Sequence, residues 1–155
     1  MPRLRAGVRL ALPLLQVLGA LAGCKSKSEE DRVREVIQKV VDAANEKKPG
    51  QVVADALPSF RGPQNADLAD CRRIVTAYLL APGWVHVFVR DLEVTVDGET
   101  AKATLDTVLA QGKPVEKLED LLPTNGDALT FVVELVQQDG EWKLSRATYR
   151  KSTGL

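Results

Sequence analysis

The spacing of hydrophobic residues changes at Gly83, and this change constrains the fold more than any other feature of the sequence. Before Gly83, hydrophobic residues recur every three or four positions, which is the period of an amphipathic helix. After Gly83 they alternate with polar residues, which is the period of a half-buried strand. Helices followed by a run of strands predict an α+β domain, with N-terminal helices packed on a curved antiparallel β-sheet.

Two main helices are predicted before Gly83. The first starts after Ser28, whose side chain can cap free backbone N–H groups, and it ends at Pro49-Gly50. The second starts at Asn65 or Asp67 and ends at Pro82-Gly83. The two hydrophobic stripes, which we expect to face one shared surface, are Val33, Val36, Ile37, Val40, Val41 and Ala44, and Leu68, Cys71, Ile74, Val75, Tyr78 and Leu79. Between them, residues 51–57 predict a short helical piece that ends at Pro58.

The first strand is predicted to be long and bent. Its hydrophobic residues occupy odd positions from Val85 to Val89 and even positions from Leu92 to Val96. A one-residue slip near Arg90 reconciles the two halves as a β-bulge. Asp97-Gly98 then predicts a hairpin. The returning strand carries one inward-facing row, Ala101, Ala103, Leu105, Thr107 and Leu109.

A loop over residues 112–127 interrupts the alternation, with one or two helical turns expected at 115–122. A third strand and a second hairpin at Asp139-Gly140 follow. The expected inward rows of the last two strands are Leu129, Phe131, Val133 and Leu135, and Trp142, Leu144, Ala147 and Tyr149, the latter with another parity slip.

The first 22 residues have the character of a secretory leader. Residues 1–9 carry three arginines and no acidic residue, and residues 10–22 are apolar apart from Gln16. The apolar run is interrupted by Pro13 and is shorter than the roughly 20 residues that a membrane-spanning helix needs. We therefore expect this segment to be cleaved from the mature protein.

The leader ends in Leu21, Ala22, Gly23 and Cys24. This tetrapeptide resembles the lipobox of bacterial lipoproteins, in which the cysteine receives a diacylglyceryl group and a dedicated signal peptidase cleaves before it. The resemblance implies that Leu21, Ala22 and Gly23 are recognised by the peptidase and that Cys24 is lipidated. Several acyl chains, such as palmitate, hold a protein at a membrane durably, whereas one chain does not. The alternative is an ordinary secretory leader that ends in this tetrapeptide by chance.

This interpretation divides the chain into a signal peptide over 1–23, a lipidated tether over 24–28 and a single α+β domain over 29–151. Lys25 follows the cysteine. Some lipoproteins that stay in the inner membrane have aspartate at this position, so the resemblance favours the outer membrane of a bacterial cell envelope.

Composition narrows the choice of partners. The whole chain has 21 basic and 21 acidic residues, and the leader removes three arginines, so the mature domain is mildly acidic. It lacks the basic stripe that nucleic-acid binding requires. His86 is the only histidine and has no cysteine neighbour at ligand spacing, so we expect no metal site and no cofactor. Cys71 lies in a helical stripe and is expected to be buried, with an intermolecular disulfide or a reactive thiol as the alternatives.

The closing segment VVELVQQDGEWKLSRATYR carries a family resemblance. A strand, a tight Asp-Gly turn and the pattern W-x-L-x-x-A-x-Y, after two helices and long bent strands, resemble the nuclear transport factor 2-like superfamily. The residues that carry it are Leu135, Asp139, Gly140, Trp142, Leu144, Ala147 and Tyr149. The resemblance implies the cone fold also called cystatin-like or ketosteroid-isomerase-like, over about residues 29–150. Catalytic members place acids with a tyrosine or histidine in the cone, and no residue here matches those positions by spacing alone.

Four residues are candidates for lining a pocket in such a cone: Tyr78, His86, Asp106 and Trp142. His86 lies between Trp84 and Phe88, opposite the valines, and can act as a base near neutral pH. Asp106 and Glu134 fall on the more polar faces of their strands, where solvated carboxylates are expected. The simpler interpretation of Trp142 is a core or rim aromatic. We therefore predict no catalytic residue.

The outward face of the third strand carries Val132 and Val136, so it needs a cover. The candidates are a second subunit, residues 112–127, or a protein partner in the envelope. Three functions remain open. The favoured one is a membrane-anchored, non-catalytic domain that binds a protein or a small apolar ligand. The alternatives are a small-molecule isomerase, dehydratase or hydrolase that uses the cone, and a structural accessory subunit of an envelope complex.

Overall fold

The computed structural model describes residues 26–120 and 126–152, and in them helices precede a sheet as the sequence predicts. The helices are α1 (Glu29–Asn45), α2 (Pro49–Val52) and α3 (Leu68–Leu79), with short 3-10 helices at Pro63–Asn65 and Leu118–Asp120. The strands are β1 (Ala56–Arg61), β2 (Trp84–Asp97), β3 (Thr100–Gly112), β4 (Gly126–Gln138) and β5 (Glu141–Lys151).

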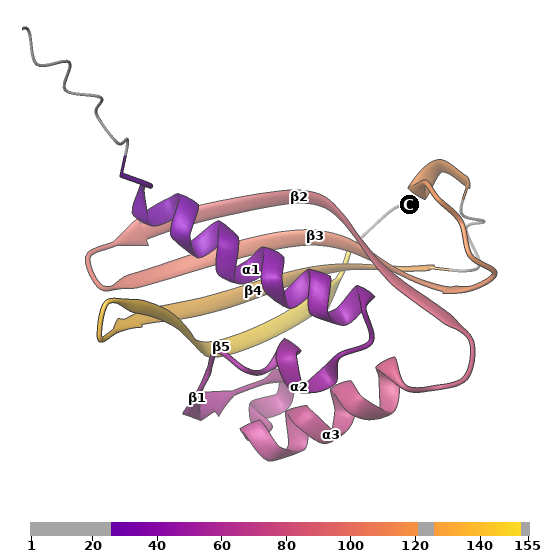
Figure 1. Ribbon diagram of the computed structural model, residues 1–155, viewed down its shortest axis with the longest axis horizontal. Coiled ribbons are helices and arrows are strands. Elements are labelled where there is room, and N and C mark those ends of the chain that lie inside the picture. Colours follow the sequence, from indigo (N-terminus) through magenta and orange to yellow (C-terminus); the bar gives the residue numbers. More distant parts are fainter. Residues whose placement is uncertain (1–25, 121–125, 153–155) are drawn as a thin grey trace, which may run out of the picture.

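The five strands form one sheet in the order β1-β5-β4-β3-β2. Strands β2 to β5 are an antiparallel meander, and β1 pairs with the edge of β5 in parallel. Helix α1 crosses the sheet, while α2 and α3 lie beside β1 (Figure 1). The predicted α+β class is confirmed, with β1 making the sheet mixed. We call the face that α1 covers the inner face and the opposite face the outer face.

Both predicted parity slips are real bulges. The β2–β3 register runs from Val89 to Asp91 without a partner for Arg90, and the β4–β5 register skips Ser145 in the same way. An extra residue increases the local twist and bends the strand. Both long hairpins therefore curve around α1. The two hairpin turns also lie where the Asp-Gly pairs predict them, with Gly98 and Gly140 at positive φ.

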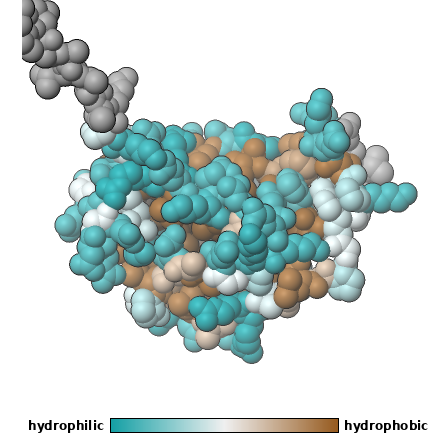
Figure 2. Space-filling view, in the orientation of Figure 1, coloured by the Kyte–Doolittle hydropathy of each residue, from teal (hydrophilic) through white to brown (hydrophobic). Residues whose placement is uncertain are grey.

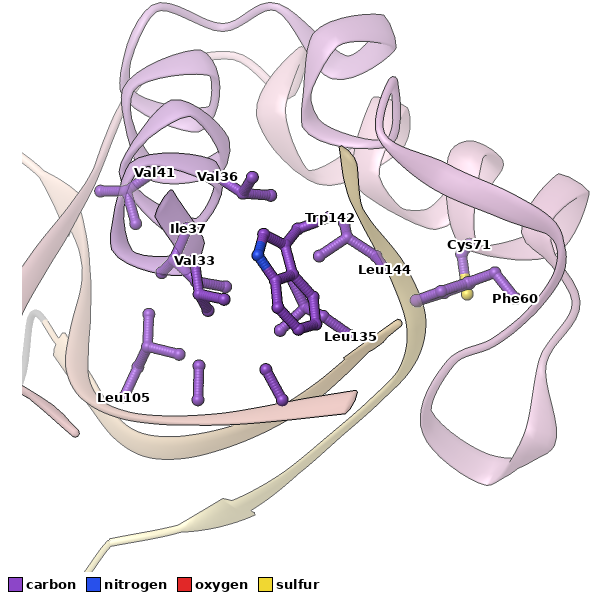
Figure 3. Close-up of a cluster of buried hydrophobic side chains, with 12 residues drawn as sticks. Val33, Val36, Ile37, Val41, Phe60, Cys71, Leu105, Leu135, Trp142 and Leu144 are labelled. Carbon is purple, nitrogen blue, oxygen red and sulfur yellow. The ribbon is translucent and has the colours of Figure 1, made fainter. Parts of the chain in front are cut away.

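The core lies between α1 and the inner face. Four residues of the predicted α1 stripe are buried, and Trp142 lies against them (Figure 3). The small side chains of Ala101 and Ala103 on β3 let the helix approach the sheet closely. The remaining members of this cluster include Leu105, Leu135 and Leu144.

Hydrogen bonds fix both ends of α1 on the sheet. At its start, Glu29 accepts from the indole N–H of Trp142 at 2.8 Å and from the Gln137 amide at 3.1 Å, and Arg32 donates to the Gly140 carbonyl. At its end, the Asn45 side chain pairs with the Val87 backbone in both directions, at 2.7 and 3.1 Å. The helix therefore starts at the hairpin turns and ends where β2 begins.

The segment between the helices departs from the prediction. We predicted a helix over 51–57 that ends at Pro58, but α2 covers only Pro49–Val52 and Pro58 lies inside β1. The Leu144 N–H donates to the Asp55 carbonyl at 2.8 Å and starts the pairing with β5. Proline lacks an N–H and is tolerated in an edge strand. A contact with a strand far away in the sequence thus overrides the local helical pattern.

In α3 the predicted N-terminal cap is confirmed, but only part of the predicted hydrophobic stripe is buried. The Asp67 carboxylate accepts from the Asp70 N–H at 2.8 Å. Cys71 is 7% exposed, as predicted, and burial raises the pKa of its thiol. A Cβ atom on Gly62 would lie 2.2 Å from the Cys71 sulfur, so this close approach requires glycine. Ile74, by contrast, is 63% exposed, so the expectation that it faces the shared surface is wrong.

We predict that Glu29→Gln removes an acid-sensitive share of the stability. The Trp142 indole N–H, followed by Arg32, holds the pKa of Glu29 below its ordinary value of 4.5. A carboxyl group whose pKa is lower in the folded state stabilises the fold at pH values above its unfolded-state pKa. This stabilisation is lost as the pH falls through the folded-state pKa. Urea unfolding should show the variant less stable at pH 7, with the difference shrinking below about pH 4.5.

The matched control is Glu30→Gln, which changes the exposed neighbouring residue. It should follow the wild-type pH dependence. Equal curves for Glu29→Gln and Glu30→Gln would contradict the assigned role of the Trp142–Glu29 contact.

Candidate functional site

A pocket of about 540 Å³ opens at the end of the domain away from the two hairpin turns. The last turn of α3, the start of β2, the end of β3 and the start of β4 form its walls (Figure 1). This volume is in the range of small-molecule sites. Its lining residues are Tyr78, Ala81, Pro82, Gly83, Trp84, Val85, Leu109, Gln111, Gly112, Gly126 and Asp127.

The pocket exists because β2 begins and β3 ends beyond the end of α1. Helix α1 ends at Asn45, whereas β2 and β3 continue past it to Trp84 and Gly112. Gly83 and Gly112 have φ of +106° and +108°, a conformation that glycine adopts without strain. The inner face is therefore left without its helical cover at this end.

The pocket combines an apolar floor with a few polar groups. Val85 and Leu109 extend the inner face into it. The Gln111 side-chain amide donates to the Tyr78 hydroxyl at 2.8 Å and joins β3 to α3. Asp127 is exposed and is the only charged residue among the described residues that line the pocket. The arrangement suits a small ligand that has an apolar body and a neutral or cationic polar group.

Of the four pocket candidates from the sequence, Tyr78 alone lines this pocket. His86 lies on the outer face between Trp84 and Phe88, with ring centroids 5.7 and 4.5 Å away. Partial burial lowers the pKa of His86. Asp106 also lies on the outer face, where its carboxylate accepts from the Thr130 hydroxyl at 2.6 Å.

Trp142 is 3% exposed and belongs to the core, with its indole N–H on Glu29. Glu134 forms a 3.8 Å ion pair with Arg146 on the outer face. Residues that sequence analysis missed are Gln111 and Asp127. The sequence marks these two residues only by their position: each lies next to a glycine at one end of the 112–127 loop, and such glycines often mark the end of a strand.

The lipidation residues Leu21, Ala22, Gly23 and Cys24 lie outside the described residues. Within 26–120 and 126–152, no helix has the length and apolar character needed to cross a membrane. The same residues contain no group of three or more histidine, cysteine or acidic side chains placed to hold a metal ion.

Comparison with known proteins identifies the fold. No protein-family model and no curated protein matches the sequence. Solved structures do match. A nuclear transport factor 2-like protein of unknown function from Pseudomonas putida KT2440 has a TM-score of 0.65 and 13% identity, covering 81% of this chain and 88% of that one. An uncharacterised protein with a cystatin-like fold from Caulobacter vibrioides has a TM-score of 0.64 and 15% identity, covering 79% and 89%.

A third structure, from Streptomyces avermitilis, is assigned as a dehydratase of the nuclear transport factor 2-like family. It has a TM-score of 0.65 and 15% identity and covers 80% of this chain and 96% of that one. At such identities the likeness establishes the fold alone. The fold is thus the nuclear transport factor 2-like cone that the pattern ending in Tyr149 predicts.

Proposed function

We propose that this chain is a lipid-anchored domain of the bacterial cell envelope that binds a small, partly apolar ligand at the mouth of the cone without transforming it. The observation that carries the non-catalytic part is the separation of the candidate acids and bases. A catalytic site holds its acid, base or nucleophile within hydrogen-bond reach of one another and of the bound molecule. His86 and Asp106 lie on the outer face, whereas Tyr78 lines the pocket.

The interior of the cone supports the same proposal. The space between α1 and the sheet is filled by aliphatic side chains and Trp142 (Figure 3). A ligand is therefore confined to the mouth, where Leu109 and Val85 supply apolar contact and Tyr78, Gln111 and Asp127 supply polar contact. The lining favours a neutral or cationic ligand over an anion, because a buried anion beside Asp127 would be repelled.

The start of α1 fits a short membrane tether. Ser28 caps the helix, with its side chain accepting from the Asp31 N–H at 3.1 Å. The chain from Cys24 to Ser28 reaches at most about 15 Å. Lipid on Cys24 would hold the hairpin end of the domain close to the membrane, with the pocket at the opposite end. The exposed surface on the helical side is mostly hydrophilic, with hydrophobic patches between elements (Figure 2).

Lipidation is tested by Cys24→Ser in the full chain. The expected product is an uncleaved precursor without acyl chains, because the peptidase acts only after the sulfur is modified. Mass spectrometry of the protein purified from membranes measures both events. Cys71→Ser, which changes the other cysteine of the chain, is the control and should be processed like the wild type. A normally cleaved, acylated Cys24→Ser product would refute the anchor.

Ligand binding is tested with the neutral fluorescent probe N-phenyl-1-naphthylamine. Tyr78→Ala should weaken binding at least about tenfold, because it removes one wall of the pocket and the contact with Gln111. Ile74→Ala is the matched control, since Ile74 lies one turn earlier on α3, is 63% exposed and does not line the pocket. Equal affinities for the two variants, or no saturable binding by the wild type, would contradict a pocket of this kind.

A second candidate is an enzyme that works in the same pocket. One observation favours it: Tyr78 and Asp127, a phenol and a carboxylate, both line the pocket. Incubation of a bacterial envelope extract with the protein, followed by proton NMR, would reveal conversion of a compound. Under the binding proposal, wild type and the Tyr78→Phe/Asp127→Asn variant give identical spectra. A change produced by the wild type alone would replace the binding proposal with catalysis.

A further inference from the structure

The sheet has two edges, and helix α1 closes one of them. Strand β2 is the last strand on that side, so half of its backbone groups point away from β3. The Asn45 side chain binds both backbone groups of Val87, at 2.7 and 3.1 Å. Arg34 donates to the Leu92 carbonyl at 2.8 Å. At this edge α1 therefore occupies backbone groups that a further strand would need.

The other edge of the sheet is closed only in part. Strand β1 runs beside β5, and the last pair in their register is Arg61 with Arg146. The chain then leaves the sheet and forms the 3-10 helix at Pro63–Asn65, which contacts β5. Ala147 still packs against the core. Beyond it, residues 148–151 are all exposed, and in the part of the chain that the structure describes no strand pairs with this stretch from the β1 side.

The register of β5 determines which backbone groups point out of this edge. The Ser152 N–H donates to the Ala128 carbonyl at 2.8 Å, so Arg150, two residues earlier in the same register, also bonds to β4. Residues that bond to one neighbouring strand alternate with residues whose groups point the other way. The N–H and carbonyl groups of Tyr149 and Lys151 therefore point away from β4. Among residues 26–120 and 126–152 these groups have no hydrogen-bond partner.

The side chains of this stretch differ between the two faces. On the inner face the Tyr149 ring packs against Phe131, with ring centroids 5.7 Å apart, and Tyr149 is still 50% exposed. Arg150 lies on the outer face, and Lys151 follows it at the end of the strand. Neither cation forms an ion pair within the described residues. After Glu141, β5 contains no acidic residue. The edge therefore offers one apolar contact and an uncompensated positive charge.

We propose that the free edge of β5 at residues 148–151 binds an extended acidic segment of another protein, which joins the sheet as a further strand. Strand addition takes its affinity from main-chain hydrogen bonds and its specificity from alternate side chains. Side chains of the added strand alternate between the two faces as those of β5 do. One set lies beside Tyr149 on the inner face and the other beside Arg150 on the outer face. The segment that fits therefore alternates apolar and acidic residues.

The charge of the edge selects a foreign segment over a second copy of this chain. Pairing two β5 edges would bring Arg150 and Lys151 of one copy next to the same cations of the other. Like charges on neighbouring strands are destabilising, whereas opposite charges stabilise the pair. An acidic segment gains from the same two residues that oppose self-pairing.

NMR of the ¹⁵N-labelled full chain tests this edge with a peptide that alternates glutamate and valine. In the free protein, the amide hydrogens of Tyr149 and Lys151 should exchange with solvent faster than that of Arg150, which bonds to β4. Saturating peptide should shift the first two amides and protect them from exchange, with a Kd below about 1 mM. The same peptide N-methylated along its backbone should not bind. No residue of β5 lines the pocket, so the result is independent of the pocket ligand.

Variants of β5 separate backbone pairing from charge. Tyr149→Pro removes an N–H that the β4 ladder does not use, so the fold should persist while peptide affinity falls at least about tenfold. Tyr149→Ala keeps this N–H and should bind more tightly than Tyr149→Pro. Arg150→Glu should weaken binding at least about tenfold. Arg72→Glu, an equal charge reversal on an exposed residue of α3, is the control and should bind like the wild type. Circular dichroism checks the fold of each variant.

Several results would overturn the proposal. One is protection of the Tyr149 and Lys151 amides without peptide, as when another segment or a second copy covers the edge. The others are the lack of saturable binding at about 1 mM, binding that leaves these two amides unchanged, and equal affinities for Arg150→Glu and Arg72→Glu. If Tyr149→Pro does not fold, the N-methylated peptide replaces it, and binding of that peptide as tight as that of the parent peptide contradicts strand addition.

Discussion

The hydrogen bond from the Trp142 indole N–H to the Glu29 carboxylate fixes α1 on the sheet, and the rest of the domain depends on where that helix lies. Trp142 is 3% exposed, so its N–H would lack a partner without Glu29. The contact sets the start of α1 at the hairpin turns, and the length of the helix sets its end near Val87. The helix fills the hairpin half of the inner face, and the pocket lies in the part it leaves uncovered.

Features that depend on neighbouring residues could be predicted from the sequence. Side chains alternate along a strand with a period of two, so an inserted residue moves every later side chain to the other face. The parity changes near Arg90 and after Leu144 are visible in the sequence, and both bulges lie where these changes predict them. The caps Ser28 and Asp67 and the two Asp-Gly turns are equally local. Together these features specify two helices and four bent strands.

Features that depend on distant residues could not be predicted. Strand β1 has no alternation and contains Pro58, and it exists because β5 offers it an edge. The pocket combines Tyr78, Gln111 and Asp127 from three elements, and only the closed fold brings them together. The segment that bounds it, 112–127, has no periodic pattern. Ile74 was misplaced for the same reason, since helical spacing does not say which part of a stripe meets the sheet.

The alternation of side chains along each strand, which builds the core, also limits which residues of the sheet can face the pocket. His86 alternates with the inward-facing Val85 and Val87, and Asp106 alternates with Leu105 and Thr107. To turn either residue toward the pocket, its strand would have to slip by one position. That slip would expose the buried side chains that hold α1 in place. Ionisable groups can therefore enter the cone from α3 or from the strand ends, where Tyr78 and Asp127 already lie, without loss of the core.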